Sequence, residues 1–304
     1  MIRFSTRSPS VSVVMPVYNG GQYLAEAMNS ILEQTFRDFE FIIIDDGSTD
    51  SSAKTIRSFK DKKVVFHQNT QNMGNFASRN IGMEMARGRY ICVMDADDIS
   101  FPRRLEKQFA YMEAHSDVGI GGSFIQLLPG QIIPNFIVDE ELLKVAFLSN
   151  SHCAHPSLIM RKSYLNEFGL KYNEAYYYAA DFDICARAFQ YFKVRNIPAI
   201  LLQYRRHQEQ ISTAKFTEQQ KFADMIRIKQ LTENLGFQVE EIPVSLHLQL
   251  MKRERIDEAN KMAVHNWINT ICNRNRQYRY YEEARLKGFL NRLVSYSMGL
   301  KSKE

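Results

Sequence analysis

The clearest chemistry in the sequence is a group of carboxylates in the stretch Asp95-Ala96-Asp97-Asp98. In Asp-x-Asp spacing, two oxygens can converge on one hard cation such as Mg²⁺ or Mn²⁺. A cation held there could bind a diphosphate, which carboxylates alone would repel. The stretch also begins like a calcium loop, but Ile99 and Ser100 stand where an EF-hand needs an oxygen ligand and a glycine.

Polar residues also follow two other apolar runs. Asp45-Asp46 come directly after Phe39–Ile44, and Tyr18-Asn19 come after Val11–Val17. The carboxylate group itself follows a run of the same kind, Tyr90–Met94. These short Val- and Ile-rich runs predict buried strands. Taken alone, Asp45-Asp46 is more typical of a turn that caps the next helix.

Segments with helical spacing of apolar residues lie between these strands, at Leu24–Leu32, around Ile56 and at Asn72–Ala86. Strands alternating with helices over short connections predict an α/β fold with a parallel sheet covered by helices. The polar strand ends then meet at one edge, where such sheets bind ligands. Further along we expect strands at Val118–Leu128, Pro156–Met160 and Ala199–Tyr204, and a helix at Asp181–Tyr191.

The strand signal fades beyond about residue 211, and residues 215–235 and 254–300 are predicted to be charged helices. We therefore expect a catalytic domain over residues 1–214, followed by a helical C-terminal region over 215–304. Within the first domain, residues 10–100 would bind a nucleotide and residues 101–214 an acceptor.

Positive charge is concentrated near the C-terminus. Residues 271–304 contain eight Lys/Arg and three Asp/Glu, so this segment accounts for the whole net charge of +5. It also carries aromatic and leucine residues, as amphipathic helices at membrane surfaces do. A solvated helix face, packing on the protein and a nucleic-acid contact are the alternatives. We expect no nucleic-acid partner.

The four cysteines form no CxxC pair, which disfavours a zinc knuckle and fits a reducing compartment. No apolar stretch reaches the length of a membrane span. The expected location is therefore the cytoplasm, with at most a peripheral contact to the inner face of the membrane.

Two common nucleotide-binding classes fit poorly. A dinucleotide-binding site of the Rossmann type needs G-x-G-x-x-G after the first strand, whereas that turn reads Tyr18-Asn19-Gly20-Gly21-Gln22. The Walker pattern is absent as well. These observations disfavour an NAD-dependent oxidoreductase.

Several motifs in order resemble glycosyltransferase family 2. They are VSVVMPVYNG, FIIIDDGSTDSS, NMGNFASRNIGMEMARGRYICVMDADD, HPSLIMRKSYLNEFG, AADFDICARA and YRRHQEQIS, and together they span about residues 10–213. The resemblance implies a GT-A fold, with a Rossmann-like mixed sheet flanked by helices, and an inverting enzyme that uses a nucleotide-sugar. The C-terminal helices would be an extension of that fold.

The resemblance also implies a nucleotide site. Pro16, Val17, Tyr18 and Asn19 would lie along the nucleobase, and Asp46 would accept a hydrogen bond from the uracil ring nitrogen. Arg79, Asp95 and Ala96 would complete the nucleotide site, with Asp95 near the ribose.

By the same resemblance, Asp97, Asp98 and His207 would hold Mn²⁺ or Mg²⁺, with no ranking between the two aspartates. Asp181 stands where the family has its catalytic base, although Ala180 replaces the usual preceding glutamate. Asp183, two residues further, is expected to cap a helix or face solvent.

The expected reaction is a single displacement that moves one sugar from a nucleotide-diphosphate sugar, with UDP favoured, to an acceptor hydroxyl. Trp267 is the only tryptophan and lies far from any Gln-x-x-Arg-Trp motif, which disfavours a processive synthase. The acceptor would be a saccharide or lipid-linked saccharide in bacterial surface polysaccharide or lipopolysaccharide synthesis. A sugar-phosphate nucleotidyltransferase and a non-catalytic nucleotide-sugar-binding module remain as alternatives.

Overall fold

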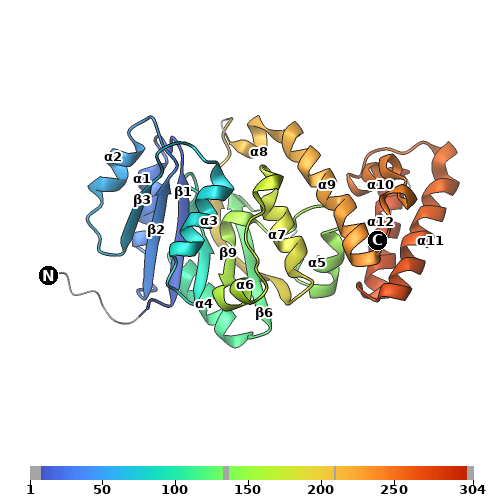
Figure 1. Ribbon diagram of the computed structural model, residues 1–304, viewed down its shortest axis with the longest axis horizontal. Coiled ribbons are helices and arrows are strands. Elements are labelled where there is room, and N and C mark those ends of the chain that lie inside the picture. The colour runs from blue at the N-terminus through green and yellow to red at the C-terminus, as the bar shows by residue number, and fades with distance from the viewer. Residues whose placement is uncertain (1–7, 133–136, 209, 300–304) are drawn as a thin grey trace. The chain divides into compact units, whose positions relative to one another are not determined.

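A computed structural model describes residues 8–132, 137–208 and 210–299 (Figure 1). The chain forms two compact units. The first unit comprises residues 1–136 and 153–214, and the second comprises residues 137–152 and 215–304.

The first unit is built on one mixed sheet, with strand order β3-β2-β1-β4-β8-β6-β9-β5 and β7 paired to β6. Its N-terminal half is parallel, as predicted. In register, β1 pairs Val11 with Phe39 of β2 and with Tyr90 of β4. The four strands of this half are β1 (Val11–Val17), β2 (Phe39–Asp45), β3 (Val64–Gln68) and β4 (Tyr90–Val93).

The sheet becomes mixed beyond β4, because β8 runs antiparallel to both β4 and β6 while β6 and β9 are parallel. The short β5 closes this half by pairing with β9, which places the segment after β4 beside the end of β9. The strands are β5 (Ile99–Ser100), β6 (Val118–Leu127), β7 (Gln131–Ile132), β8 (Ile159–Arg161) and β9 (Lys193–Tyr204).

Helices flank this sheet, and α3 packs closely on β1. A Cβ at Gly82 would lie 2.4 Å from Cγ1 of Val14, so α3 rests directly on β1. The helices of this unit are α1 (Leu24–Leu32), α2 (Ser52–Ser58), α3 (Asn75–Met85), α4 (Arg104–Ala114), α6 (Lys162–Glu167), α7 (Ala180–Ala188) and α8 (Ile211–Ala214), with 3₁₀ turns η1 (His155–Ser157) and η2 (Glu174–Tyr176). The predicted mixed α/β architecture is confirmed.

One predicted strand is partly wrong. Residues Pro156–Met160 were expected to be extended, but η1 occupies His155–Ser157 and the strand begins only at Ile159. Pro156 has no N–H to give a sheet ladder, and its fixed φ suits the first turn of a helix. Helix α4 was not predicted.

The second unit is helical and contains α5 (Glu140–Ala146), α9 (Phe216–Leu235), α10 (Val244–Met251), α11 (Lys261–Tyr278) and α12 (Glu283–Ser297), with 3₁₀ turns η3 (Val239–Glu241) and η4 (Glu258–Asn260). Residues 137–152, which were expected in the first domain, lie in this unit because Val145, Ala146 and Leu148 pack in its core.

That core also buries the apolar residues of α12. Phe289, Leu290 and Leu293 are at most 4% exposed, as is Tyr281 before the helix. These apolar residues therefore build the core of the second unit, and a peripheral membrane contact stays a prediction. Among the described residues, no helix is long and apolar enough to cross a bilayer.

Candidate active site

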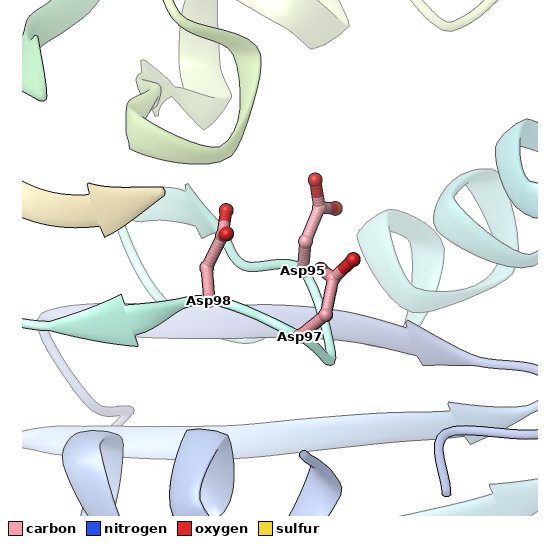
Figure 2. A group of neighbouring side chains, drawn as sticks. All are labelled: Asp95, Asp97 and Asp98. Atoms are coloured by element: carbon pink, nitrogen blue, oxygen red, sulfur yellow. The ribbon is translucent and has the colours of Figure 1, made fainter. Parts of the chain in front are cut away.

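The acidic group lies in the turn that follows β4, at the carboxyl edge of the parallel strands. Ligand oxygens of Asp95, Asp97 and Asp98 all lie within 4.8 Å of one another. Figure 2 shows the three side chains rising from this one turn. Asp95 and Asp97 are partly exposed, whereas Asp98 is fully buried. The structure therefore brings the three predicted carboxylates together.

Buried negative charge dominates the electrostatics of this turn. Burial, followed by the charges of Asp95 and Asp97, raises the pKa of Asp98 well above its ordinary value. Burial also raises the pKa of Asp95, with Arg79 opposing the shift. Oδ2 of Asp98 is buried and accepts no hydrogen bond from any group that the structure describes. Such a site favours either a proton or a cation.

The segment after β9 packs onto this turn. Nε2 of His207 lies 2.9 Å from Oδ2 of Asp97. The backbone N–H of Arg205 donates to Oδ1 of Asp98 at 3.0 Å, and its Nε donates to the carbonyl of Asp97 at 2.9 Å. Gln210 donates to the carbonyl of Arg205, which closes the loop. The pairing of β5 with β9 makes this meeting possible.

Two buried arginines lie beside the acidic turn. Arg79, 1% exposed, pairs with Asp95 and also donates to the carbonyl of Met94 at 3.3 Å. Arg104, completely buried, donates to the carbonyls of Val93 and Pro156 at 2.6 and 2.8 Å. The resemblance placed Arg79 against the nucleotide, and the structure shows it against Asp95. Arg104 was missed, although a basic residue on the buried face of an amphipathic helix is itself a signal.

Asp46 is occupied by groups of the chain itself. Its carboxylate accepts from the side-chain amide of Asn69 at 2.8 Å and from the N–H groups of Met73 and Gly74 at 2.9 and 2.8 Å. The residue is 2% exposed. Asp46 therefore fixes the loop that leads into α3, and its contact with a uracil ring stays a prediction.

The four predicted residues at the end of β1 differ in exposure. Pro16 and Val17 are buried within the strand, whereas Tyr18 is 50% exposed and Asn19 is exposed too. Oδ1 of Asn19 accepts from the N–H of Thr49 at 2.9 Å, which joins this turn to the one after β2. Tyr18 thus presents a ring to solvent beside two linked turns, where a planar base could stack.

Asp181 lies in the first turn of α7 and is partly exposed. Burial raises its pKa to about 6, although hydrogen bonds from N–H groups of the same turn oppose the shift. The charges of Asp95 and Arg79 also act on this pKa, which puts Asp181 in the same electrostatic environment as the acidic turn. A carboxylate with this pKa can serve as a general base near neutral pH.

Asp183 is not the exposed residue that was expected. It is 1% exposed, and its Oδ2 accepts from Nε of Arg187 at 2.7 Å. Two residues along a helix turn the side chain to the opposite face, which here is the buried one. Arg187 follows one turn later and neutralises it.

The model of "Glycosyl transferase family 2" matches residues 12–168, more than half of the 304-residue chain. The chain belongs to glycosyltransferase family 2.

Relatives agree with this assignment. An uncharacterized glycosyltransferase of Haemophilus influenzae is 30% identical over 268 residues, covering 84% of this chain and 83% of its own. MJ1057, an uncharacterized glycosyltransferase of Methanocaldococcus jannaschii, is 38% identical over 207 residues, or 65% of this chain and 71% of its own. WfgD of Escherichia coli, named as a UDP-Glc:α-D-GlcNAc-diphosphoundecaprenol β-1,3-glucosyltransferase, is 26% identical over 223 residues, or 71% and 85%.

Solved structures share the fold at low identity. Staphylococcus aureus TarS 1–349, in complex with UDP-GlcNAc, superposes with a TM-score of 0.63 at 16% identity over 96% of this chain and 89% of its own. The mannosyltransferase PcManGT of Pyrobaculum calidifontis, in complex with GDP-Man and Mn²⁺, gives 0.57 at 14% identity over 98% and 89%. The fold of this family 2 glycosyltransferase is therefore of the GT-A type, as the resemblance implied.

A divalent cation fits the residues of this family 2 site. The donors are carboxylate oxygens with an imidazole nitrogen, a set that suits Mn²⁺ or Mg²⁺. Oδ2 of Asp98 is buried and has no hydrogen-bond partner among the described residues, and three carboxylates lie close together. Both features favour added positive charge. The site thus combines oxygen and nitrogen atoms that could bind a cation with a carboxylate, Asp181, that could accept a proton.

Proposed function

We propose that this family 2 enzyme transfers one sugar from a UDP-sugar to an acceptor hydroxyl with inversion at the anomeric carbon. The observation that carries the proposal is the contact of Asp97 with His207 in the acidic turn, whose Asp95 also acts on the pKa of Asp181. A nucleotidyltransferase would have no use for a carboxylate base at that point, so transfer to a hydroxyl is the better match.

Asp97, Asp98 and His207 would hold the cation in this proposal. Mn²⁺ or Mg²⁺ bound there supplies positive charge to the departing diphosphate. Asp97 is the first ligand because its carboxylate is partly exposed beside His207, whereas Asp98 is buried and already accepts from Arg205. Tyr18 would stack on the base, and Asn19, Pro16 and Val17 would line the same side.

Asp181 takes the proton of the acceptor hydroxyl as that oxygen attacks the anomeric carbon. The bond to the nucleoside diphosphate breaks on the opposite face, so the configuration inverts in one displacement. With a pKa of about 6, Asp181 is mostly ionised at pH 7.5 and still basic enough to accept a proton as the transition state forms. A second carboxylate nucleophile is not required.

The acceptor is proposed to be a saccharide or lipid-linked saccharide in bacterial surface polysaccharide or lipopolysaccharide synthesis. Support comes from WfgD, whose name gives UDP-Glc as donor and a diphosphoundecaprenol-linked sugar as acceptor. The TarS structure in complex with UDP-GlcNAc supports the same donor class.

A thermal-shift panel followed by turnover tests the function. UDP, GDP and CDP are each added with and without Mn²⁺. A ligand at 100 times its Kd stabilises by about 2.7 kcal/mol, which is measurable. UDP with Mn²⁺ should raise the midpoint more than UDP alone, and the UDP-sugars are then screened for release of UDP. A response to GDP but not UDP would overturn the donor assignment, and no response to any diphosphate would overturn the transferase site.

Contact with an anionic membrane is proposed to use charge rather than an inserted helix. Arg253 lies 5.9 Å from the ring of Tyr296, which is 64% exposed. Arg292 lies one helical turn before Tyr296 on α12, and Nη1 of Arg255 lies 3.1 Å from the position that a Cβ of Gly299 would take, just beyond that helix. Arg253, Arg255, Arg292 and Tyr296 are called the cationic patch of the second unit. In the described part of the chain, Arg253, Arg255 and Arg292 are exposed and form no ion pair. Unpaired arginines beside an exposed tyrosine suit an anionic lipid surface.

Co-sedimentation with vesicles tests this contact. The protein should sediment with phosphatidylglycerol vesicles and not with phosphatidylcholine vesicles, and R253S/R255S/R292S should abolish sedimentation. R89S/R276S/R285S is the matched control, because it removes three exposed arginines that already pair with carboxylates. Equal behaviour of the two variants would show that only net charge matters and would overturn the patch.

A further inference from the structure

Two neighbouring residues of α3 reach two different parts of the active site. Arg79 pairs with Asp95, as described above. Asn80, 6% exposed, makes two hydrogen bonds with the backbone of Tyr172: its Nδ2 donates to the carbonyl at 2.9 Å, and its Oδ1 accepts from the N–H at 3.0 Å. The same amide also donates to Oε1 of Glu174 at 3.0 Å. Asn80 therefore fixes the start of the segment 172–181.

Three successive backbone hydrogen bonds join most of the segment from Tyr172 to Asp181. The N–H of Tyr176 donates to the carbonyl of Asn173 at 3.0 Å, and the N–H of Ala179 donates to the carbonyl of Tyr176 at 2.8 Å. The carbonyl of Ala179 in turn accepts from Phe182 at 3.1 Å, in the first turn of α7. A displacement at Tyr172 would therefore be passed along the backbone to Asp181.

Other contacts restrict the segment to the surface of α3. The ring of Phe76 lies 5.1 Å from that of Tyr172. Gly74, the residue before α3, has φ +97°, and a Cβ there would lie 2.6 Å from Cε2 of Tyr177. Arg187 of α7 donates to the carbonyl of Lys171 at 2.7 Å, just before the segment begins. The helix that holds Asp95 through Arg79 thus also holds the segment that ends at Asp181.

We propose that Asn80 is a positioning residue that sets the place of Asp181 relative to Asp95. This inference rests on the proposed function, in which Asp181 is the base. Asn80 does not touch the reacting atoms, and it acts through Tyr172 and the segment 172–181. Catalysis by a positioned base is sensitive to placement, and a displacement of about 1 Å can cost on the order of 100-fold in rate.

The chain contains a matched control for Asn80. In the second unit Asn275, 2% exposed, makes the same two hydrogen bonds with the backbone of Tyr281. Its Nδ2 donates to the carbonyl at 2.9 Å, and its Oδ1 accepts from the N–H at 2.9 Å. Asn275→Ala therefore removes the same two hydrogen bonds from a similarly buried site. It should lower the stability of the second unit, whereas Asp181 belongs to the first.

The experiment compares Asn80→Ala, Asn80→Asp and Asn275→Ala in the full chain. The turnover probe is the UDP-sugar that the wild-type protein converts fastest, and the binding probe is UDP with Mn²⁺. Asn80→Ala should lower kcat by about 10- to 100-fold, with the Kd for UDP within about two-fold of wild type. Asn275→Ala should leave both unchanged. Asn80→Asp keeps the acceptor but sets a carboxylate oxygen against the carbonyl of Tyr172 and against Glu174, so its kcat should fall at least as far as that of Asn80→Ala.

Amide hydrogen exchange provides an arm that needs no substrate. In Asn80→Ala, exchange should rise in peptides covering 172–183 and stay unchanged in those covering 39–46 and 90–98. Unchanged exchange in 172–183, or a loss of UDP binding as large as the loss of kcat, would overturn the positioning role. Failure of the wild-type protein to bind UDP would instead count against the proposed function, while the exchange result still decides the role of Asn80 in placing the segment.

Discussion

Nε2 of His207 lies 2.9 Å from Oδ2 of Asp97, although 110 residues separate them in the sequence. The two meet because the chain leaves β9 beside the turn that follows β4. Arg205 holds the same segment in place, because its backbone N–H donates to Oδ1 of Asp98 and its Nε donates to the carbonyl of Asp97. An imidazole and a carboxylate at this distance can share one cation or hydrogen-bond to each other.

His207→Ala should therefore weaken Mn²⁺ binding. Loss of one ligand, or of a residue that orients a ligand, costs about 10- to 100-fold in metal affinity. Electron paramagnetic resonance of free Mn²⁺ during a titration of the protein measures this directly. His265→Ala is the control, because His265 is exposed on α11 and its ring, among the residues that the structure describes, bonds only to the carbonyl of Lys261. Equal affinities of the two variants for Mn²⁺ would show that His207 does not contribute to the cation site.

Asp181→Asn should abolish transfer and at the same time stabilise the protein. General-base catalysis contributes about 10²- to 10⁴-fold, so the rate should fall by that factor while UDP binding persists. Burial raises the pKa of Asp181 to about 6 from 3.8, so the folded state resists its ionisation. The contribution of the neutral Asp181 side chain to folding stability is therefore complete below pH 3.8 and is lost as pH rises through 6. The amide of Asp181→Asn stays neutral at every pH, so the variant does not suffer that loss of stability.

The stability change should accordingly depend on pH. Asp181→Asn should gain on the order of 1–3 kcal/mol at pH 7.5, and the gain should vanish near pH 4. Urea unfolding at the two pH values measures the difference. A variant that is less stable than wild type at pH 7.5 would show that Asp181 makes favourable contacts that outweigh its burial.

The rate of transfer should itself report the pKa of Asp181. Because only the carboxylate form accepts a proton, kcat/KM should fall on the acid side with an apparent pKa near 6. A pH profile of UDP release from pH 4.5 to 8.5 tests this, with the stability of the protein checked at each pH. A limb centred near 4 would mean that Asp181 is solvated in the working enzyme.

Much of the first unit followed from the sequence because β1, β2 and β4 are buried on both faces. The short Val- and Ile-rich runs Val11–Val17 and Phe39–Ile44 are typical of buried strands. Parallel pairing brings the polar residues at their ends to one edge of the sheet. That edge holds Asp95, Asp97 and Asp98 as expected. The acidic turn was thus predictable from local pattern and sheet topology.

Contacts between distant segments could not be predicted in this way. Nothing in the spacing indicates that Asp46 uses its carboxylate to hold the loop before α3, or that Arg79 pairs with Asp95 rather than facing solvent. Helix α5 is another case, since its apolar residues predict burial without saying in which core. His207 was placed only by resemblance, because its partner lies on another strand end.

Two glycines in helices should respond to alanine in opposite directions. Alanine is favoured over glycine in a helix by about 1 kcal/mol. At Gly288 of α12 an added Cβ meets only the end of Arg292 at 3.8 Å, so Gly288→Ala should stabilise the second unit by about 0.5–1 kcal/mol. At Gly82 the Cβ would lie 2.4 Å from Cγ1 of Val14, which forces α3 away from β1.

Gly82→Ala should therefore destabilise the first unit by about 1–3 kcal/mol in spite of the gain in helix propensity. Because α3 also carries Arg79 and Asn80, the shift should reduce turnover as well, whereas Gly288→Ala should leave turnover unchanged. Hydrogen exchange resolves the two units separately and measures both changes in free energy. A gain in stability at Gly82 would show that α3 can move on the sheet at little cost, and it would weaken the view that this helix fixes the spacing of Asp95 and Asp181.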